Sequence, residues 1–498
     1  MSVATLTSRA SLGTGAPPVT IEVFLSGGLP TFSMVGMAQT AVRESKDRVR
    51  GAIINAGFRF PQQRITVSLA PADMRKDGGR FDLAIALGIL AASRQIPAEP
   101  LEDVEVYGEL ALDGGLRPVT GLLPAIVAAD DADRPALIPA ANADEASLVS
   151  SGTRVAGHLL DVCRWLRGAG ELSAATSRHE KPAVTTHPNL ADVRGQLAAR
   201  RALEIAATGG HNLLLVGPPG TGKTMLARRL PSLLPPMTRR DAIETAAVRS
   251  VSGDELAPGT FKQRPFRAPH HSASAVALVG GGISPCPGEI SRAHNGVLFL
   301  DELPEFQRDV LEALREPLES GTVSLARANY RVTFPARFQL VAAMNPCPCG
   351  YAGDPSADCH CSADRVTAYR GRVSGPLLDR IDMHVEVATQ PLSMLRTPQA
   401  MESSETVAER VRHARDTAMA RQGGLNADLD KDTLEGMVEP DGWALLDAAS
   451  ERLSLSARSA YRVLRVSRTI ADLANAETIT PPHVAEALSY REWARRPQ

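Results

Sequence analysis

The N-terminal region alternates strand-like and helix-like stretches of hydrophobic residues. Short strands are predicted by alternating or apolar runs at residues 19–25, 64–69 and 104–108. Apolar positions at helical spacing predict helices over residues 41–56 and 81–92. This mixture of elements is typical of an α+β domain with a mixed sheet, which we assign to residues 1–170.

The central region carries continuous apolar runs instead. Small and polar residues from 171 to 189 mark a linker, and a helix is predicted after it at residues 197–207. Buried strands are predicted by the apolar runs 213–216, 297–300 and 338–343. Strands that are apolar on both faces are typical of a parallel sheet, so we expect an α/β fold over residues 190–394.

The C-terminal region is helical and charged. Apolar positions at helical spacing follow Glu405 and recur from Ala457 to Leu473. A last helix is predicted to begin at Pro481, with Thr480 as its cap. We therefore expect residues 395–498 to form a small helical lid.

The composition is that of an ordinary globular protein. Of 498 residues, 44% are hydrophobic and 22% are charged, and the net charge of −2 restricts any nucleic-acid contact to a local patch. No apolar run reaches the ~18 residues that a membrane span needs. The N-terminus lacks the basic-then-apolar order of a secretory signal. We expect a cytoplasmic protein with no membrane partner.

A glycine-rich stretch follows the apolar run 213–216 and precedes a helical segment. Its residues are Gly217, Pro218, Pro219, Gly220, Thr221, Gly222, Lys223 and Thr224. Strand, glycine-rich turn and helix N-terminus are the context of a P-loop, whose backbone N–H groups surround phosphates. Lys223 would supply charge to the β- and γ-phosphates, and the Thr224 hydroxyl would hold Mg²⁺. We expect a nucleoside triphosphate to bind here.

Two carboxylates, Asp301 and Glu302, end the apolar run 297–300. An apolar run that ends in two acids is a weak signal alone, but it becomes informative downstream of a P-loop. Asp301 is placed to hold Mg²⁺, and Glu302 could polarise the attacking water.

Four further segments surround these two motifs, at residues 264–271, 280–282, 287–291 and 303–306. Together with the P-loop they resemble the AAA+ ATPases of the magnesium-chelatase-like group, and within it the YifB/ComM family. The resemblance covers essentially the whole chain and implies an ATP hydrolase that uses ATP and Mg²⁺. Members are cytoplasmic, and those studied are implicated in DNA branch migration during transformation.

The resemblance also implies roles for two residues of the core. Asn345 follows the run 338–343 and resembles the sensor-1 residue that orients the lytic water. Arg380 resembles an arginine finger, which acts on the ATP of a neighbouring subunit. A residue acting in trans implies a ring, so we expect a homohexamer. The alternative for Arg380 is a surface salt bridge with Asp379 or Asp382.

In the helical region, Arg458 resembles the sensor-2 arginine that reaches the γ-phosphate of its own subunit. Arg462 and Arg465 are close competitors for this role.

Two N-terminal stretches, residues 76–82 and 108–123, resemble the protease domain of the Lon family. The active proteases need a serine and a lysine there, because the amine serves as base for the hydroxyl. Neither stands at the corresponding place in this chain. The resemblance implies a Lon-like domain that has lost its chemistry and serves in binding or assembly.

Four of the six cysteines form two close pairs, Cys347 with Cys349 and Cys359 with Cys361. Four thiolates from two turns can hold Zn²⁺, and His360 could replace one of them. The Cys-x-Cys spacing is less common than Cys-x₂-Cys, so a reactive dithiol or cysteines that are simply buried are the alternatives. We expect the neighbouring histidines at 270 and 271 to be structural or substrate-facing.

A hairpin is predicted by the alternating runs 322–325 and 331–334. The resemblance places it in the pore of the ring, where it would present Arg327, Asn329, Tyr330 and Arg331. Guanidinium groups suit phosphates, and a tyrosine offers a stacking face to any base. A hairpin tip that contacts only solvent is the alternative to this DNA site.

Several functions fit these features. The first is a DNA-remodelling ring, with single-stranded or branched DNA as partner. The second is the motor subunit of a magnesium or cobalt chelatase, against which the Lon-like region and the cysteine pairs argue. An ATP-dependent protease is disfavoured by the missing serine and lysine. An ATP-driven switch without translocation is the last alternative.

Overall fold

The computed structural model describes residues 2–36, 39–72, 74, 76, 78–149, 152–176, 188–256, 258–282, 285–327, 330–355, 357–391 and 401–491. It divides the chain into two compact units. The first comprises Met1–Val184, Arg239–Lys262 and Ala326–Phe334, and the second comprises Thr185–Thr238, Gln263–Leu325 and Pro335–Gln498. Within the described residues we find no helix with the length and hydropathy of a membrane span.

The first unit is built on an eight-stranded mixed sheet with the order β10-β9-β8-β5-β1-β2-β4-β3. Its strands are β1 (Ser2–Arg9), β2 (Pro18–Ser26), β3 (Thr31–Val35), β4 (Arg64–Ala70), β5 (Glu105–Val106), β8 (Ala136–Pro139), β9 (Arg154–Ala156) and β10 (Ser173–Ala174). The long strands β1, β2 and β4 are antiparallel, whereas β1, β5, β8 and β9 are parallel neighbours. The predicted mixed sheet is therefore present.

Two helices predicted from spacing, α1 (Gln39–Asn55) and α2 (Asp82–Ala92), are present in this unit. Every residue of α2 is buried, because this helix is apolar all round and packs between β1, β2 and α1. The remaining helices are α3 (Leu123–Asp130), α4 (Ala143–Ser147), α5 (Leu159–Leu166) and α9 (Arg239–Val251), and β6 (Glu109–Leu110) pairs with β7 (Leu116–Arg117).

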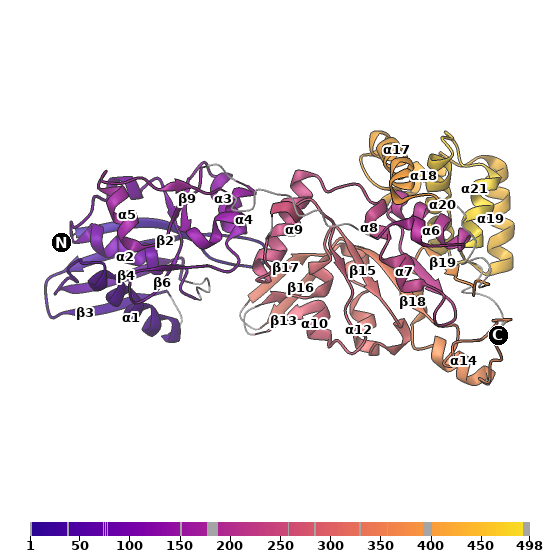
Figure 1. The fold of residues 1–498 in the computed structure, drawn as a ribbon, viewed down its shortest axis with the longest axis horizontal. Coiled ribbons are helices and arrows are strands. Elements are labelled where there is room, and N and C mark those ends of the chain that lie inside the picture. Colours follow the sequence, from indigo (N-terminus) through magenta and orange to yellow (C-terminus); the bar gives the residue numbers. More distant parts are fainter. Residues whose placement is uncertain are drawn as a thin grey trace. The chain divides into compact units, whose positions relative to one another are not determined.

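The second unit contains a parallel sheet, of which Figure 1 labels β15, β18 and β19. The sheet has five strands in the order β12-β15-β18-β11-β19. The strands are β11 (Leu213–Val216), β12 (Phe266–Arg267), β15 (Val297–Leu300), β18 (Gln339–Met344) and β19 (Met383–Glu386). Alternate side chains enter two cores: Leu213 and Leu215 pack with the C-terminal helices, and Leu214 and Val216 pack on the other face. This burial on both faces is why the strands are continuous apolar runs.

Short helices and hairpins complete the core of this unit. They are α6 (Leu197–Gly209), α7 (Lys223–Ala227), α8 (Leu230–Leu233), α10 (Ala275–Val279), α11 (Glu289–Arg292), α12 (Arg308–Ala313), α13 (Pro317–Ser320), α14 (Ala363–Arg370) and α15 (Gly375–Leu378), with the strand pair β13 (Gly280–Gly281) and β14 (Cys286–Pro287). The strand pair β16 (Thr322–Arg327) and β17 (Tyr330–Pro335) is divided by the unit boundary, because its residues 326–334 are counted with the first unit.

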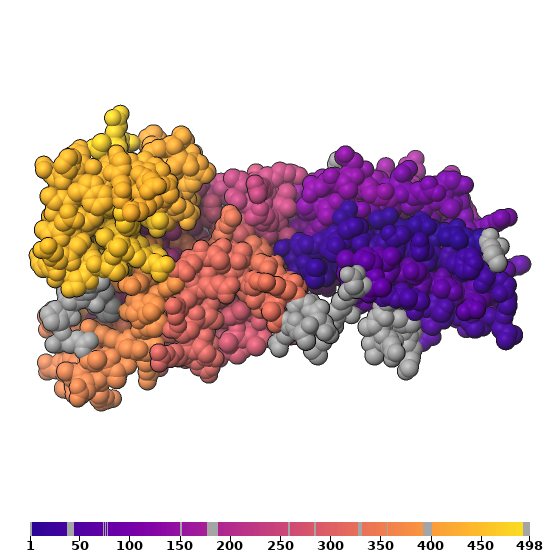
Figure 2. Space-filling view, turned by 180° about the vertical axis from the view of Figure 1, so that it is seen from behind, coloured from indigo at the N-terminus to yellow at the C-terminus, as the bar shows by residue number. Residues whose placement is uncertain are grey.

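The C-terminal residues are helical, as their spacing predicts. They form α17 (Ser404–Gln422), α18 (Lys431–Glu435), α19 (Pro440–Leu453), α20 (Ala457–Leu473) and α21 (Pro481–Ser489). Figure 2 shows them, orange to yellow, as one continuous body. Contacts of α17 and α20 with α6 join these helices to the parallel sheet, so the structure groups them with the core instead of separating a third unit.

The two units also differ from our domain boundaries inside the core. Residues 239–262 and 326–334, which we assigned to the α/β region, belong to the first unit. Apolar packing explains this placement for α9, because Ala246 and Leu256 share a buried cluster with Leu123 and Leu148. Sequence order alone cannot show such a return of the chain.

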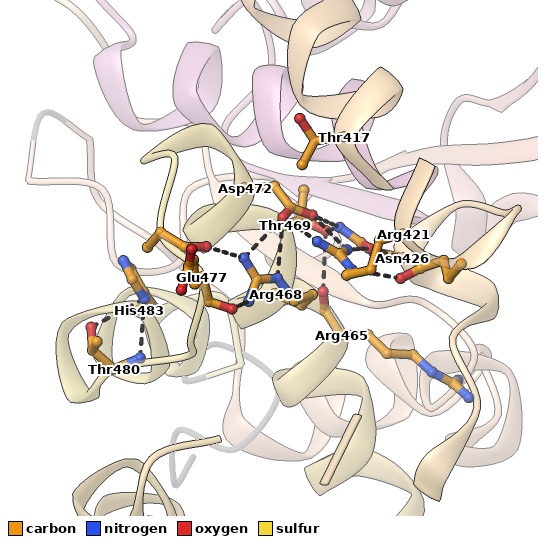
Figure 3. Close-up of polar contacts among 12 residues, drawn as sticks. Thr417, Arg421, Asn426, Arg465, Arg468, Thr469, Asp472, Glu477, Thr480 and His483 are labelled. Carbon is orange, nitrogen blue, oxygen red and sulfur yellow. Dashed lines mark hydrogen bonds and ion pairs between the residues drawn. The ribbon is translucent and has the colours of Figure 1, made fainter. Parts of the chain in front are cut away.

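A buried polar cluster holds the C-terminal helices together (Figure 3). Asp472 accepts from Arg421 of α17 at 2.7 Å and from Arg468, one turn earlier on α20, at 2.9 Å. The amide of Asn426 donates to the same carboxylate at 2.7 Å and to Thr469 at 3.1 Å. Both members of the Arg468–Asp472 pair are 1% exposed, so each depends on the other for compensation of its charge.

We predict that Asp472→Ala destabilises the protein by about 3–5 kcal/mol, because it leaves the buried Arg468 guanidinium without its carboxylate and also removes the ion-pair partner of the partly buried Arg421. The midpoint of urea unfolding, followed by circular dichroism, measures this loss. The matched control is Asp447→Ala on the exposed face of α19, which should change stability by less than about 0.5 kcal/mol. Equal midpoints for the two variants would contradict a structural role of the cluster.

Candidate active site

The P-loop connects β11 to α7 at the carboxyl edge of the parallel sheet. It contains two glycines in the left-handed region, Gly220 with φ of 79° and Gly222 with φ of 91°. Residues with a Cβ rarely adopt these angles, so glycine is needed for the chain to turn back toward its own strand. The turn ends at Lys223, where α7 begins.

Lys223 is buried inside this loop. Its Nζ donates to the carbonyl oxygens of Gly217 at 2.6 Å and Pro218 at 2.8 Å, and to Oδ1 of Asn345 at 3.1 Å. Burial lowers the pKa of Lys223, while the carboxylates of Asp301 and Glu302 oppose this shift. The ammonium group therefore lies among acceptors that it can exchange for phosphate oxygens.

Thr224 and Asp301 lie side by side. The Thr224 hydroxyl donates to Oδ2 of Asp301 at 2.7 Å, and Oδ1 of the same carboxylate accepts from the Glu302 backbone N–H at 3.0 Å. Hydroxyl and carboxylate oxygens are hard ligands of the kind that Mg²⁺ prefers. The oxygens of Thr224 and Asp301 thus fit the Mg²⁺ ion that the sequence predicts at this position.

Glu302 adopts a left-handed backbone conformation with φ of 53°. Its Oε2 lies 3.0 Å from Nδ1 of His271. The His271 ring contacts His270, with centroids 4.1 Å apart, and meets the edge of Phe306 at 6.5 Å. A non-glycine residue at positive φ is uncommon and marks a position that the surrounding structure must hold.

Sequence reasoning did not assign His271 to this site. Its partner Glu302 is distant in sequence, and only the fold brings them together. The adjacent pair of histidines within the segment 264–271 was the available signal, and it carried no information about the partner.

Asn345 follows β18, which lies between β15 and β11 in the sheet. The carboxyl ends of parallel strands meet at one edge, which brings Asn345 within hydrogen-bond distance of Lys223. The structure thus brings the P-loop, the two carboxylates and Asn345 together at one edge of the sheet.

Arg380 lies at the opposite edge of the same sheet. Its carbonyl accepts from Asn212, the residue that precedes β11, so a whole strand of roughly 13 Å separates it from the P-loop of its own chain. The guanidinium is buried and donates to Glu319 at 2.6 Å and to the carbonyl of Pro376 at 2.7 Å.

The alternative that we considered for Arg380, a surface salt bridge with Asp379 or Asp382, differs from the salt bridge in the structure. Among the contacts described, Arg380 pairs with Glu319, and Arg462 takes Asp382 at 2.5 Å.

Arg458 joins Arg380 on the same oxygen of Glu319, at 3.0 Å, and its side chain is 60% exposed. The structure therefore does not bring Arg458 to the P-loop, and our expectation that it reaches the γ-phosphate of its own subunit gains no support. Its two competitors are also placed elsewhere, since Arg462 binds Asp382 and Arg465 donates to the carbonyl of Leu429.

The four cysteines of the predicted metal site form one cluster, with all four sulfurs within 4.8 Å of one another. Sγ of Cys347 lies 3.3 Å from that of Cys349 and 3.7 Å from that of Cys359. The backbone N–H of Ala352 donates to Cys347 at 3.3 Å. Hydrogen bonds from the Tyr351 backbone and from Cys347 lower the pKa of Cys349 to about 6, which favours the thiolate form.

The predicted hairpin is present as β16 and β17. Arg331 is exposed, whereas Val332 and Phe334 of the same strand are buried. Asn329 and the side chains of Arg327 and Tyr330 lie outside the described residues. The proposed DNA contact therefore stays a prediction, with Arg331 as its described member.

Residues 76–82 and 108–123, whose sequences resemble the Lon family, contact each other in the first unit. The Arg80 guanidinium donates to the carbonyls of Thr120 and Gly121 at 2.9 and 3.1 Å, and the Gly108 N–H donates to the Arg80 carbonyl. Lys76 is buried and donates to the carbonyl of Met74 at 3.0 Å. Asp77 of this stretch lies outside the described residues.

Comparison with known proteins matches three family models to successive parts of the chain. These are "Subunit ChlI of Mg-chelatase" at residues 21–142, "Magnesium chelatase, subunit ChlI" at 189–395 and "Magnesium chelatase, subunit ChlI C-terminal" at 401–491. The competence protein ComM of Haemophilus influenzae is 52% identical over 99% of this chain and 98% of its own length. The YifB protein of Escherichia coli is 48% identical over 99% and 97%.

The chain belongs to the ComM/YifB family of magnesium-chelatase-like proteins. Its similarity to dedicated chelatase subunits is weaker. The magnesium-chelatase 38 kDa subunit of Cereibacter sphaeroides is 25% identical over 55% of this chain and 73% of its own length. The ComM/YifB relatives, in contrast, align with both structural units of the chain.

We predict that Lys223→Ala weakens ATP binding by about 100-fold, because it removes a charge-assisted contact worth about 3 kcal/mol. Titration with a fluorescent ATP analogue measures the Kd. Arg228→Ala, an exposed cation after α7, is the matched control and should bind like the parent. Parental affinity in Lys223→Ala would refute the assignment of the P-loop.

Proposed function

We propose that this chain is the subunit of a ring-shaped ATPase that remodels DNA. The convergence of Lys223, Asn345 and the Thr224–Asp301 pair at one sheet edge supports the ATPase part of the proposal. The DNA part is supported by the relative named competence protein, which suggests a role in transformation. Branch migration or helicase activity would be the form of DNA remodelling.

Each group at the edge has a role in the proposed hydrolysis. Mg²⁺, held by Thr224 and Asp301, would neutralise charge on the phosphates. Glu302 is the general base for water, and its contact with His271 holds the carboxylate in a defined orientation. The Asn345 side-chain oxygen accepts from Lys223 beside the P-loop, and we propose that this amide orients the water.

The opposite sheet edge supports action between subunits. Arg380 and Arg458 share one oxygen of Glu319, far from their own P-loop. We propose that both arginines serve the nucleotide of a neighbouring subunit, and that Glu319 holds the two like charges together. Arginines that act in trans would serve every subunit only in a closed ring, and we propose that this ring is a homohexamer.

A second candidate function is that of a chelatase motor subunit, because the matching family models describe magnesium chelatase subunits. The two candidates share the ATPase site and differ in the substrate of the motor.

We also propose that the four-cysteine cluster holds Zn²⁺ and that Arg331, with Arg327 and Tyr330, contacts DNA.

We predict that single-stranded or branched DNA stimulates ATP hydrolysis several-fold in the parent protein. Glu302→Gln should bind ATP with parental affinity and hydrolyse it at least about 100-fold more slowly, because the amide cannot act as base. A coupled assay with and without DNA measures both effects. A parental rate in Glu302→Gln would refute the base, and an ATPase that does not respond to DNA would favour the chelatase or switch alternatives.

Mixed rings test the action in trans. We predict that Arg380→Ala loses about 10³-fold in ATPase rate and regains activity when titrated with Glu302→Gln, because one intact site forms where the two variants meet. Arg458→Ala should behave in the same way.

The control for this titration is Lys223→Ala mixed with Glu302→Gln. Both changes damage the same side of the interface, so that mixture should stay inactive. No recovery in the Arg380→Ala titration would refute the role in trans.

A further inference from the structure

The cysteine cluster is continuous with the candidate active site. Cys347 is fully buried and follows Asn345 by two positions. A Cβ built on Gly350 would lie 2.7 Å from Cδ of Pro219 in the P-loop, so the backbone of the first cysteine turn packs directly on that loop. Any displacement of this turn would therefore reach both Asn345 and the P-loop.

The sulfur geometry fits a tetrahedral zinc ion. With Zn–S bonds of about 2.3 Å, tetrahedral ligands lie about 3.8 Å from one another. The sulfurs of Cys347, Cys349 and Cys359 are separated by 3.3, 3.5 and 3.7 Å. Disulfide bonds are about 2.05 Å long and join sulfurs in pairs, so a dithiol does not account for this mutual contact of three sulfurs. The N–H of Ala352 donates to Cys347, as is common around metal-bound thiolates.

The segment around the cluster has no hydrophobic core of its own. Among the described residues from Tyr351 to Ala368, none is buried. At its far end, α14 returns to the site, because Nε of Arg370 donates to the carbonyl of Pro346 at 3.0 Å. A segment without apolar burial needs another source of order, and a metal cross-link supplies it.

We propose that zinc bound by the four cysteines is a positioning element of the ATPase, which holds Asn345 and the P-loop in place. Loss of the metal would free the turn at Gly350 and weaken nucleotide binding and hydrolysis together. This proposal rests on the ATPase function proposed above. It adds that loss of the metal would lower nucleotide binding and hydrolysis at the ATPase site although the residues of that site are not substituted.

Removal of the second pair of ligands tests the dependence on metal. Cys359→Ser combined with Cys361→Ser changes thiols that are remote in sequence from Asn345. We expect zinc, measured by elemental analysis of the full-length protein, to fall from about one per chain to none. The Kd for a fluorescent ATP analogue should rise about tenfold. Cys286→Ser, an exposed thiol of the same unit outside the cluster, should keep zinc, affinity and ATPase rate.

Two glycines of the same loop test the contact without touching a ligand. Gly350 and Gly353 both have positive φ, at 92° and 78°, so alanine strains the backbone at either position. Only at Gly350 does the new methyl group meet Pro219, since nothing lies within 4 Å of the corresponding position at Gly353. We expect both alanine variants to keep zinc, and only Gly350→Ala to bind the ATP analogue about tenfold more weakly and to lower kcat.

The outcomes separate the parts of the proposal. Zinc-free parent protein, prepared under reducing conditions, would overturn it at the first step. Loss of zinc with parental nucleotide affinity and kcat in a folded variant would overturn the coupling and leave the ATPase function standing. A parent that binds zinc and nucleotide but does not hydrolyse ATP would refute the proposed function, and the affinity measurements would still decide the coupling.

Discussion

The parallel register of β15, β18 and β11 is the constraint on which the candidate active site depends. Val216 pairs with Met344, and Leu300 pairs with Ala342. The residues that follow each strand therefore leave the sheet at one edge, close enough for direct hydrogen bonds. A slip of one residue would turn every side chain of a strand to the other face and separate these groups. The two cores on either face hold the register in place.

A buried positive charge sets the chemistry of that edge. Lys223 is shielded from solvent, and a charge without acceptors there would cost several kcal/mol. Two loop carbonyls and the Asn345 amide supply those acceptors, and the nearby carboxylates add a favourable field. The opposite edge reverses the arrangement, since one carboxylate, Glu319, serves two arginines. The sheet thus has one edge with a buried ammonium group and another edge with two arginines that share a carboxylate, and our proposal of action between subunits depends on this separation.

Different parts of the second unit are ordered by different forces. The strands are held by apolar burial on both faces, and the C-terminal helices combine apolar packing with the buried Arg468–Asp472 pair. The cysteine segment has neither, because its described residues from Tyr351 to Ala368 are all at least partly exposed. Its sulfur cluster lies next to Asn345, so the least buried part of the site is also the part where a metal would matter most.

The local sequence pattern was sufficient to predict those strands, helices and turns that are determined by residues close together in the sequence. The apolar runs around Leu214 and Leu298, the P-loop glycines and the spacing of α1, α2 and α20 follow from burial and backbone geometry within a few residues. The local pattern could not predict contacts between residues that are distant in sequence, because these contacts depend on which surfaces meet after folding. Only the tertiary structure decided that His271 contacts Glu302, that α9 packs in the first unit, and that Arg458 joins Arg380 at Glu319 instead of the P-loop. The amino acid sequence determined which chemical groups exist and which strands carry them, and the register of the parallel sheet determined which of them meet.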